Sequence, residues 1–300
     1  MTPNTKLIIG AGPTGMHTAL LLAEAGHHVK IVSRRGGTSS HPRIVHVALD
    51  ASDAESLAAP AEGASTIFNC AMPRYDRWPQ EFPPIAAAVL YVAERSGADL
   101  ITLSNVYGYG RVVGPLTENL PMAPHTVKGR VRAAMWEAAR AGSARATEVR
   151  ASDYLGRGAG SHFTLMLLPR IVRGEVASFP GDLDAVHSWT FTQDVARVLV
   201  AASASDASWG RAWHVPSNVA SVRELSARAA RLAGAPAPTL NRMSSAELDV
   251  LATTDSIMRE VVEMTYLLDS PCVLDSTETE HALGVSATPL EDVLRDTLRA

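Results

Sequence analysis

The sequence predicts an α/β fold in which a doubly wound parallel sheet carries a smaller, mostly helical C-terminal lobe. Short apolar runs alternate with longer helical patterns through the first 152 residues. Such alternation is typical of parallel strands joined by right-handed crossovers. Beyond residue 152 the alternation loosens and helical patterns dominate. A length of 300 residues suits one large domain with a smaller lobe.

The first part of the chain contains the expected core strands and their connecting helices. We predict strands at residues 6–10, 28–33, 43–49, 64–69, 99–104 and 146–152. We predict helices at residues 14–26, 84–96 and 128–142, each of which ends at or next to a glycine. In the second part we predict helices at 162–173 and 193–204 and strands at 176–179, 187–192 and 212–216.

A glycine-rich turn follows the first predicted strand. Gly10, Gly12 and Gly15 form the pattern G-x-G-x-x-G between this strand and the next helix. Such glycines allow a tight turn and a close approach to a pyrophosphate, while the helix N-terminus offers free N–H groups. The pattern predicts a Rossmann-type dinucleotide site; the alternative is a turn kept only for packing. Further contacts are expected from Pro13, Thr14 and Met16.

The end of the second strand indicates which dinucleotide is bound. An NAD site has an acidic residue there, but this chain has Ser33, Arg34 and Arg35. A carboxylate repels a 2′-phosphate, whereas arginine forks match one. We therefore predict NADP(H). The alternative is that the arginines are merely solvated and that specificity is loose.

We predict that the chain has a dinucleotide-binding part and a substrate-binding part. Residues 1–152 and 187–212 are assigned to the dinucleotide-binding domain, and residues 153–186 and 213–300 to the substrate-binding lobe. The "GAPAP" stretch at 234–238 is interpreted as a loop.

The composition excludes several classes of protein. With 46% hydrophobic and 19% charged residues and a net charge of -4, the chain reads as a globular enzyme without a nucleic-acid partner. Cys70 and Cys272 stand far apart and are expected to be small buried hydrophobes. We find no motif for a metal and no apolar run long enough for a membrane span, and we expect a cytoplasmic protein.

Several further segments carry a family resemblance. They are "SNVYGYG" (104–110), "PLTENLPMAP" (115–124), "RASDYLGRG" (150–158), "FTQDVARVL" (191–199) and the closing segment 275–298. Together with the glycine-rich turn they resemble the short-chain dehydrogenase/reductase superfamily, in its extended or atypical branch of epimerase/dehydratase-like enzymes. The resemblance implies cofactor contacts from residues after the third, fourth and sixth strands. These are Asp50, Ala51, Asn69, Cys70, Ala71 and Tyr154.

The resemblance also implies a catalytic set, from which this chain departs. In the family a serine polarises the carbonyl, a tyrosine transfers the proton, and a lysine binds the nicotinamide ribose and lowers the tyrosine pKa. Lys128 takes the place of the lysine, and Ser104 is the nearest match for the serine, one residue closer to Tyr107 than usual. The place of the tyrosine is Pro124, which carries no proton. The usual mechanism is therefore in doubt, although the cofactor site is not.

Five sources of the proton remain open. Ser104 can orient a carbonyl but is a poor acid, and His125 lies three residues before Lys128 with a suitable pKa. Tyr107 and Tyr109 are phenols that the family usually keeps for structural reasons, and Tyr154 is expected near the nicotinamide. The fifth source is a substrate hydroxyl or a water molecule, because a phenol beside a ketone can stabilise the forming alkoxide itself.

The main hypothesis is an NADPH-dependent ketoreductase with a small-molecule ketone substrate. A substrate that supplies its own phenol indicates an aromatic polyketide of the angucyclinone type, and the chain is similar to atypical reductases of actinobacterial antibiotic biosynthesis. One alternative is a nucleotide-sugar epimerase or dehydratase, which needs a base that Pro124 cannot be. Another is a non-catalytic NADP-binding protein.

The substrate side is only weakly indicated. His162 and Phe163 are placed near the cleft, His187 and Trp189 could stack on an aromatic ring, and Met166 is read as core. The loop 71–79, with Arg74, Tyr75 and Trp78, is a candidate lid, and residues 240–270 are expected to cover the cleft. In the family the helices at 84–96 and 128–142 form a dimer interface, so a homodimer is compatible with the sequence, with Met135 and Trp136 as candidate contacts.

Overall fold

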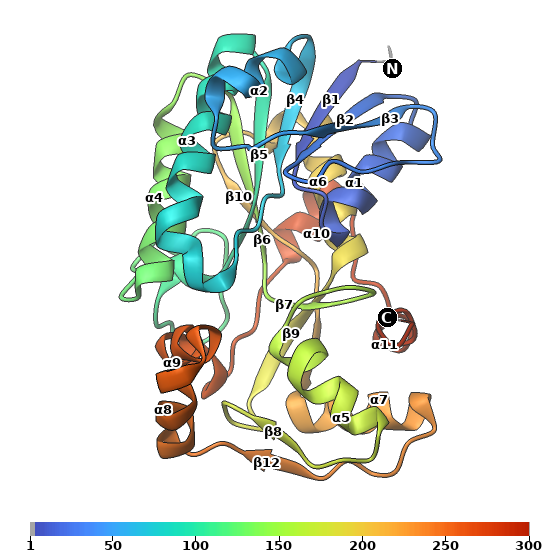
Figure 1. Ribbon diagram of the computed structural model, residues 1–300, viewed down its shortest axis with the longest axis vertical. Coiled ribbons are helices and arrows are strands. Elements are labelled where there is room, and N and C mark those ends of the chain that lie inside the picture. Colours follow the sequence, from blue (N-terminus) through green and yellow to red (C-terminus); the bar gives the residue numbers. More distant parts are fainter. Residues whose placement is uncertain (1–3, 300) are drawn as a thin grey trace.

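The computed structural model describes residues 4–299 and is built on a central parallel sheet (Figure 1). Its seven strands lie in the order β10-β6-β5-β4-β1-β2-β3. They are β1 (Thr5–Ile9), β2 (His28–Ser33), β3 (Ile44–Ala48), β4 (Ala64–Asn69), β5 (Asp99–Asn105), β6 (Ala146–Ala151) and β10 (Ala212–His214). The order reverses at β1, which pairs with both β2 and β4. Ligands of such sheets bind at the carboxyl ends of the strands beside this reversal.

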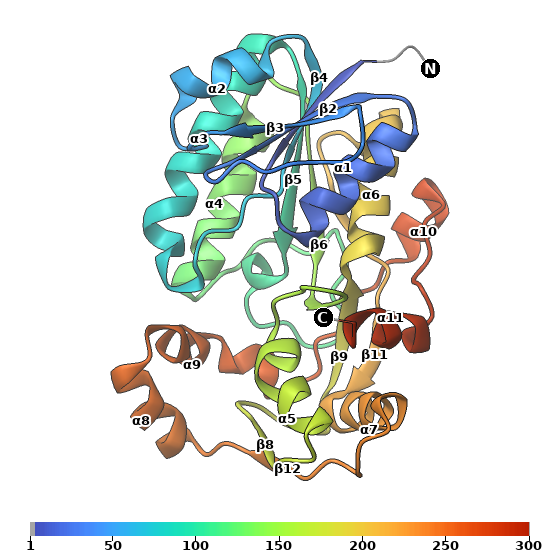
Figure 2. The same ribbon diagram turned by 45° about the vertical axis from the view of Figure 1, so that its right-hand side comes forward.

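Helices cover both faces of the sheet (Figures 1 and 2). One face carries α1 (Pro13–Glu24) and α6 (Thr192–Ala204), and the other carries α2 (Ala54–Ala61), α3 (Trp78–Ser96) and α4 (Val127–Ala141). Side chains alternate between the two faces along each strand. In β1, Ile8 packs into the core under α1, whereas Leu7 and Ile9 pack into the core under α3. The sheet is therefore buried on both sides, as a parallel sheet requires.

A second lobe lies beyond the carboxyl ends of the strands (Figure 1). It contains a three-stranded sheet of β7 (Asp153–Leu155), β9 (Val186–Phe191) and β11 (Asn218–Ser221), and a pair of β8 (Ala177–Phe179) and β12 (Leu240–Arg242). Its helices are α5 (Leu168–Val172), α7 (Val222–Ala233), α8 (Ser245–Thr254), α9 (Ser256–Leu268) and α11 (Leu290–Thr297), while α10 (Thr277–Leu283) packs back against α6. One apolar core joins these elements around Phe163 and Trp189.

The predicted α/β class and parallel sheet are confirmed, and most differences are local. The α2, β7, β11 and β12 elements are short and were not predicted. Helix α3 begins at Trp78 rather than at residue 84, because Pro79 lies in its first turn, where a missing N–H costs no hydrogen bond. Strand β9, assigned from sequence to the dinucleotide-binding part from residue 187, pairs with β7 and β11 in the second lobe.

A buried polar network fixes the turn that follows β5. The hydroxyl of Tyr109 contacts Nε2 of His214 at 2.6 Å and accepts a hydrogen bond from Arg150 at 2.6 Å. Arg150 in turn donates to Glu148 at 2.6 Å, and Nδ1 of His214 contacts the carbonyl of Asp275 at 2.9 Å. The network ties the 3₁₀ turn Tyr107–Tyr109 to β6 and β10, and so holds one wall of the region described below.

This network predicts a pH-dependent stability. Burial lowers the pKa of His214 from 6.5 to about 4. Between these pH values the unfolded chain binds a proton at this histidine and the folded chain does not, so the folded state loses roughly 3 kcal/mol as the pH falls through this range. Urea unfolding at several pH values should show a shallower dependence in His214→Gln than in the wild type. Equal slopes in the two proteins would contradict the assignment.

Candidate active site

A cavity of about 530 Å³ lies where the carboxyl ends of β5 and β6 meet the second lobe. Most of its lining is aromatic or aliphatic: Met72, Pro73, Tyr75, Trp78, Val106, Tyr107, Tyr154, Leu165, Met166, Ile257, Met258, Val261, Met264, Leu267 and Leu268. The carboxylates Asp153 and Asp255 also line it. Among residues 4–299 no lysine or arginine does. The cavity therefore suits a largely apolar molecule better than an anionic one.

The glycine-rich turn fits the backbone of a dinucleotide. Gly10 has a φ of +108°, and a Cβ there would lie 2.6 Å from the carbonyl oxygen of Cys70, so the turn needs glycine. At Gly12 a Cβ would meet no described atom within 4 Å, which leaves room in front of helix α1. Helix α1 begins directly afterwards at Pro13, so its N-terminus faces this room. The turn thus offers both the space and the dipole that a pyrophosphate needs.

The residues predicted to select NADP(H) gather at the ends of β2 and β3. Arg34 and Arg35 are exposed, and Arg34 lies 3.9 Å from Glu81 of α3. Asp50 is also exposed and accepts hydrogen bonds from the backbone and side chain of Ser52, which lower its pKa. The backbone N–H of Leu49 donates to Ser33, which holds the two strand ends together. Two exposed guanidinium groups thus lie on this side of the turn.

The remaining predicted cofactor residues lie next to the glycine-rich turn or line the cavity. Cys70 and Ala71 follow β4 against Gly10, and the side chain of Asn69 accepts a hydrogen bond from Ala71 N–H at 3.3 Å. Tyr154 lines the cavity directly after β6. The structure therefore brings the dinucleotide side and the cavity together along one edge of the sheet.

Lys128 is buried under helix α9. Helix α4 begins after Thr126, whose hydroxyl accepts from Gly129 N–H at 3.1 Å, and this cap places Lys128 in the first turn. Its side chain is 0% exposed, and its Nζ pairs with Glu260 and lies 3.5 Å from Glu263. Burial lowers the pKa of Lys128, and the charge of Glu263 opposes this effect. The lysine is therefore a cation held between α4 and α9.

A pair of tyrosine hydroxyls lies beside this cation. Nζ of Lys128 is 4.6 Å from the ring centroid of Tyr75. The Tyr75 hydroxyl is 3.2 Å from the Tyr107 hydroxyl. Both rings line the cavity, and burial raises the pKa of both phenols. The sequence indicated Tyr75 only as part of a lid, because nothing local links residue 75 to Lys128.

Ser104 and His125 lie away from the cavity. Ser104 is buried on the face of β5 that packs under α3 and α4, and its Oγ finds no hydrogen-bond partner among the described residues. The next residue, Asn105, lines the cavity, and its Oδ1 accepts from Tyr107 N–H at 3.1 Å. His125 is exposed and packs its ring edge on Tyr266 at 4.4 Å. Neither Ser104 nor His125 lines the cavity.

On the lobe side, the histidines face the cavity and their aromatic neighbours do not. His162 and His187 line the cavity, and His187 Nδ1 lies 3.8 Å from Asp153. Burial lowers the pKa of both histidines. Phe163 and Trp189 belong instead to the lobe core, where Trp189 donates to the carbonyl of Ala220, so the expectation that they face a ligand is not met. Met166, interpreted as a core residue, packs against the lobe core and also lines the cavity.

Comparison with known proteins places the chain in a family. A family model, described as the NAD dependent epimerase/dehydratase family, matches residues 7–215. The chain belongs to this family. The resemblance to the extended branch of the short-chain dehydrogenases is thereby confirmed. No curated protein matches the sequence.

Solved structures of the family share the fold over nearly the whole chain. UDP-glucose 4-epimerase from Thermotoga maritima, solved with UDP-glucose, has a TM-score of 0.79 at 18% identity and covers 98% of this chain and 97% of its own. DesIV from Streptomyces venezuelae, a dTDP-glucose 4,6-dehydratase solved with NAD and TYD, has a TM-score of 0.79 at 21% identity, covering 98% and 96%. WbmH from Bordetella bronchiseptica, solved with NAD⁺, has a TM-score of 0.77 at 17% identity, covering 99% and 97%. At sequence identities this low, the structural similarity shows a common fold and no more.

No helix within residues 4–299 is long and apolar enough to cross a bilayer. Over the same residues, no group of three or more histidine, cysteine and acidic side chains could hold a metal ion.

Proposed function

We propose that this family member is an NADPH-dependent reductase acting on the ketone of a flat, largely apolar substrate. The cavity lining carries the proposal. A nucleotide sugar has a diphosphate, which proteins bind with arginine, lysine or helix N-termini. The cavity has apolar and aromatic walls, and its charged side chains are carboxylates. An aromatic ketone matches these walls, and an angucyclinone-like polyketide of antibiotic biosynthesis is the substrate class that fits both the lining and the missing tyrosine.

The cofactor fits the edge of the sheet that borders the cavity. We place its pyrophosphate at Gly12 and the start of α1, and its 2′-phosphate at Arg34 and Arg35, with Asp50 toward the adenine. When bound, NADPH supplies a hydride to the substrate. Lys128, which the resemblance assigns to the ribose, is instead fully buried and paired with Glu260 and Glu263. The open space at Gly12 and the exposed guanidinium groups support this placement.

Asn105 is the residue that we propose to orient the ketone. Its Oδ1 is engaged by Tyr107 N–H at 3.1 Å, which leaves the amide N–H₂ group to donate into the cavity. A donor at this point stabilises negative charge on the carbonyl oxygen. Asn105 thus takes the role that the sequence gave to Ser104, one residue earlier on the opposite face of β5.

The comparisons favour a second candidate, a nucleotide-sugar epimerase or dehydratase. The family is named for these reactions, and two solved neighbours are a UDP-glucose epimerase and a dTDP-glucose dehydratase. Both reactions begin by oxidising a hydroxyl and need a base. In this chain Pro124 replaces the usual base, and no cation lines the cavity within residues 4–299 to hold a diphosphate. The geometry therefore supports the reductase more strongly.

A substrate panel separates the two candidates. The purified protein and NADPH are incubated with one test compound at a time. The compounds are aromatic ketones with a neighbouring phenol, the same ketones without the phenol, UDP-glucose and dTDP-glucose. We expect loss of NADPH absorbance at 340 nm with the ketones only. Conversion of a nucleotide sugar without net loss of NADPH would establish the epimerase or dehydratase. Cofactor binding without turnover of any compound would indicate a non-catalytic binding protein.

The arginine pair predicts the cofactor preference. Removing one guanidinium should remove charge-assisted hydrogen bonds to the 2′-phosphate, which are worth about 1.5–3 kcal/mol. Arg34→Ala should therefore weaken NADPH binding roughly 10- to 100-fold and leave NADH binding unchanged. Calorimetric titration checks this, with Arg140→Ala, an exposed arginine of α4, as the control. Equal affinity for NADPH in wild type and Arg34→Ala would remove the arginine from the site.

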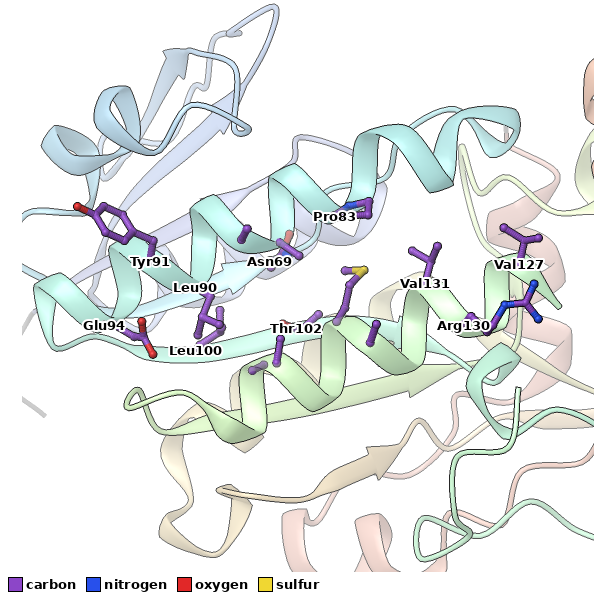
Figure 3. A pocket seen from close by; sticks show the side chains of 16 residues that line it. Asn69, Pro83, Leu90, Tyr91, Glu94, Leu100, Thr102, Val127, Arg130 and Val131 are labelled. Atoms are coloured by element: carbon purple, nitrogen blue, oxygen red, sulfur yellow. The ribbon is translucent and has the colours of Figure 1, made fainter. Parts of the chain in front are cut away.

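We also propose that the chain forms a homodimer through helices α3 and α4. A groove between them is lined by the apolar parts of both helices, and Figure 3 shows Leu90 and Tyr91 of α3 on one side and Val127 and Val131 of α4 on the other. Met135 lines this groove as expected, whereas Trp136 packs inward beneath it. In the family this helix pair forms the dimer interface, which supports the same use here.

A charge in this groove should separate the two copies. Ala134 is exposed on α4 and lines the groove, so Ala134→Glu should shift the protein from dimer to monomer in sedimentation velocity. Ala227→Glu, at an exposed alanine of α7, serves as the control and should remain dimeric. A monomeric wild type would contradict the proposed interface.

A further inference from the structure

We propose that Tyr75 supplies the proton that Pro124 cannot, with Tyr107 as its hydrogen-bonded partner. The inference rests on the proposed reductase activity and names the acid of that reaction. Tyr75 does not come from α4, the helix that carries Lys128. It comes from the segment between β4 and α3, 53 positions before Lys128 in the chain, and reaches the lysine only in the folded protein.

The hydroxyls of Tyr75 and Tyr107 lie together at the cavity. Tyr75 and Tyr107 both line the cavity, and so do Asn105 and Tyr154. The two hydroxyls are 3.2 Å apart, which is within hydrogen-bond distance. Asn105, whose Oδ1 accepts from Tyr107 N–H, lines the same cavity. A ketone held by its amide group would therefore share the cavity with the hydroxyl pair.

Tyr75 is held in place by its neighbours. It forms the start of the 3₁₀ turn Tyr75–Arg77, and the next residue, Asp76, accepts a hydrogen bond from Ser256 at the start of α9 at 2.7 Å. Trp78 contacts the Tyr75 ring edge-on at 5.2 Å and stacks on Tyr107 at 5.7 Å. One tryptophan thus fixes both rings, and the turn is fastened to the helix that covers the cavity.

The ammonium group of Lys128 lies against the ring of Tyr75. Nζ of Lys128 lies 4.6 Å from the centroid of the Tyr75 ring. When a phenol loses its proton, the negative charge spreads into the ring, and an ammonium group against that ring stabilises it. In the family the lysine acts on a tyrosine of its own helix; here it lies against a tyrosine from another segment. Glu260 and Glu263 keep Lys128 in its charged form by pairing with it.

The reaction balances with these groups. The carbonyl π bond breaks, its carbon forms a C–H bond with the hydride supplied by NADPH, and its oxygen forms an O–H bond with the proton of Tyr75. The products are the alcohol and NADP⁺. The Tyr75 phenolate then takes the proton of Tyr107, which is replaced from water in the cavity. A phenol has an ordinary pKa of about 10 and is protonated at neutral pH before each turnover, and burial raises the pKa of Tyr75 further.

The other phenols near the site are engaged elsewhere. Tyr109 is bonded to Arg150 and His214 within the network behind β5. Tyr266 packs against His125 and Arg111 and does not line the cavity. Tyr154 lines the cavity, but no cation lies against its ring among the described residues. Tyr75 alone among these combines the cavity, a hydroxyl partner and Lys128.

Conservative substitutions test the proposal without removing a ring. Tyr75→Phe keeps the contact with Trp78 and removes only the hydroxyl, as does Tyr107→Phe. Tyr91→Phe, on the exposed face of α3, is the matched control. We expect kcat for the best ketone to fall roughly 100- to 10,000-fold in Tyr75→Phe, less in Tyr107→Phe, and not in Tyr91→Phe. The Kd for NADPH, from fluorescence titration, should be unchanged in all three.

A second readout uses the protein without cofactor. In protein labelled with 3-fluorotyrosine, the ¹⁹F signal of Tyr75, assigned from its loss in Tyr75→Phe, should move in Tyr107→Phe and in Lys128→Met. The signal of Tyr91 should move in neither. A Tyr75 signal that is insensitive to both changes would overturn the proposed pair.

The outcomes distinguish this inference from the function on which it rests. Wild-type turnover that Tyr75→Phe retains in full overturns the role of Tyr75 and leaves the reductase standing, with substrate or water as the proton source. A wild type that binds NADPH but reduces no ketone in the panel overturns both. Loss of turnover in Tyr75→Phe with intact NADPH binding and intact folding by circular dichroism supports both.

Discussion

The burial of a single ammonium group, that of Lys128, organises the region between the two lobes. A buried cation is costly unless carboxylates or aromatic rings surround it. Helix α9 brings Glu260 and Glu263 to it, and the turn after β4 brings the ring of Tyr75. Asp76 and Ser256 then join that turn to α9. Three segments far apart in the sequence are thus held together around one charge, and together they close the cavity.

The same arrangement leaves the cavity, among residues 4–299, with carboxylates but no lysine or arginine in its lining. Lys128, which lies against the ring of Tyr75, is already paired with two glutamates. The side chains that α9 adds to the cavity wall are Ile257, Met258, Val261 and Met264. The exposed guanidinium groups of Arg34 and Arg35 lie instead on the dinucleotide side. The chain keeps the family fold and its cofactor turn, while the surface offered to the substrate is apolar and aromatic. Burial of apolar substrate area is therefore the expected source of affinity.

The fold was predictable because its signals are local. Strand–helix alternation, the glycine-rich turn and the helix-ending glycines each depend on neighbouring residues, and the parallel sheet followed from them. The site was only partly predictable. Alternation along β5 puts Thr102 and Ser104 on one face and Asn105 on the other, so the strand pattern could have excluded Ser104 from the cavity. The pairing of Tyr75 with Lys128, and of Lys128 with two glutamates of α9, depends on tertiary contacts that no local pattern encodes.

Isotope transfer tests the central claim, net reduction of an apolar ketone, most directly. The protein is given NADPH that carries deuterium at both hydrogen positions of nicotinamide C4, together with an aromatic ketone, and the product is examined by mass spectrometry and NMR. A reductase places one deuterium on the carbinol carbon of the alcohol in each turnover. An epimerase returns its hydride within the active site, so a nucleotide sugar converted without any deuterium from added NADPH, and a ketone left unlabelled, would contradict the account.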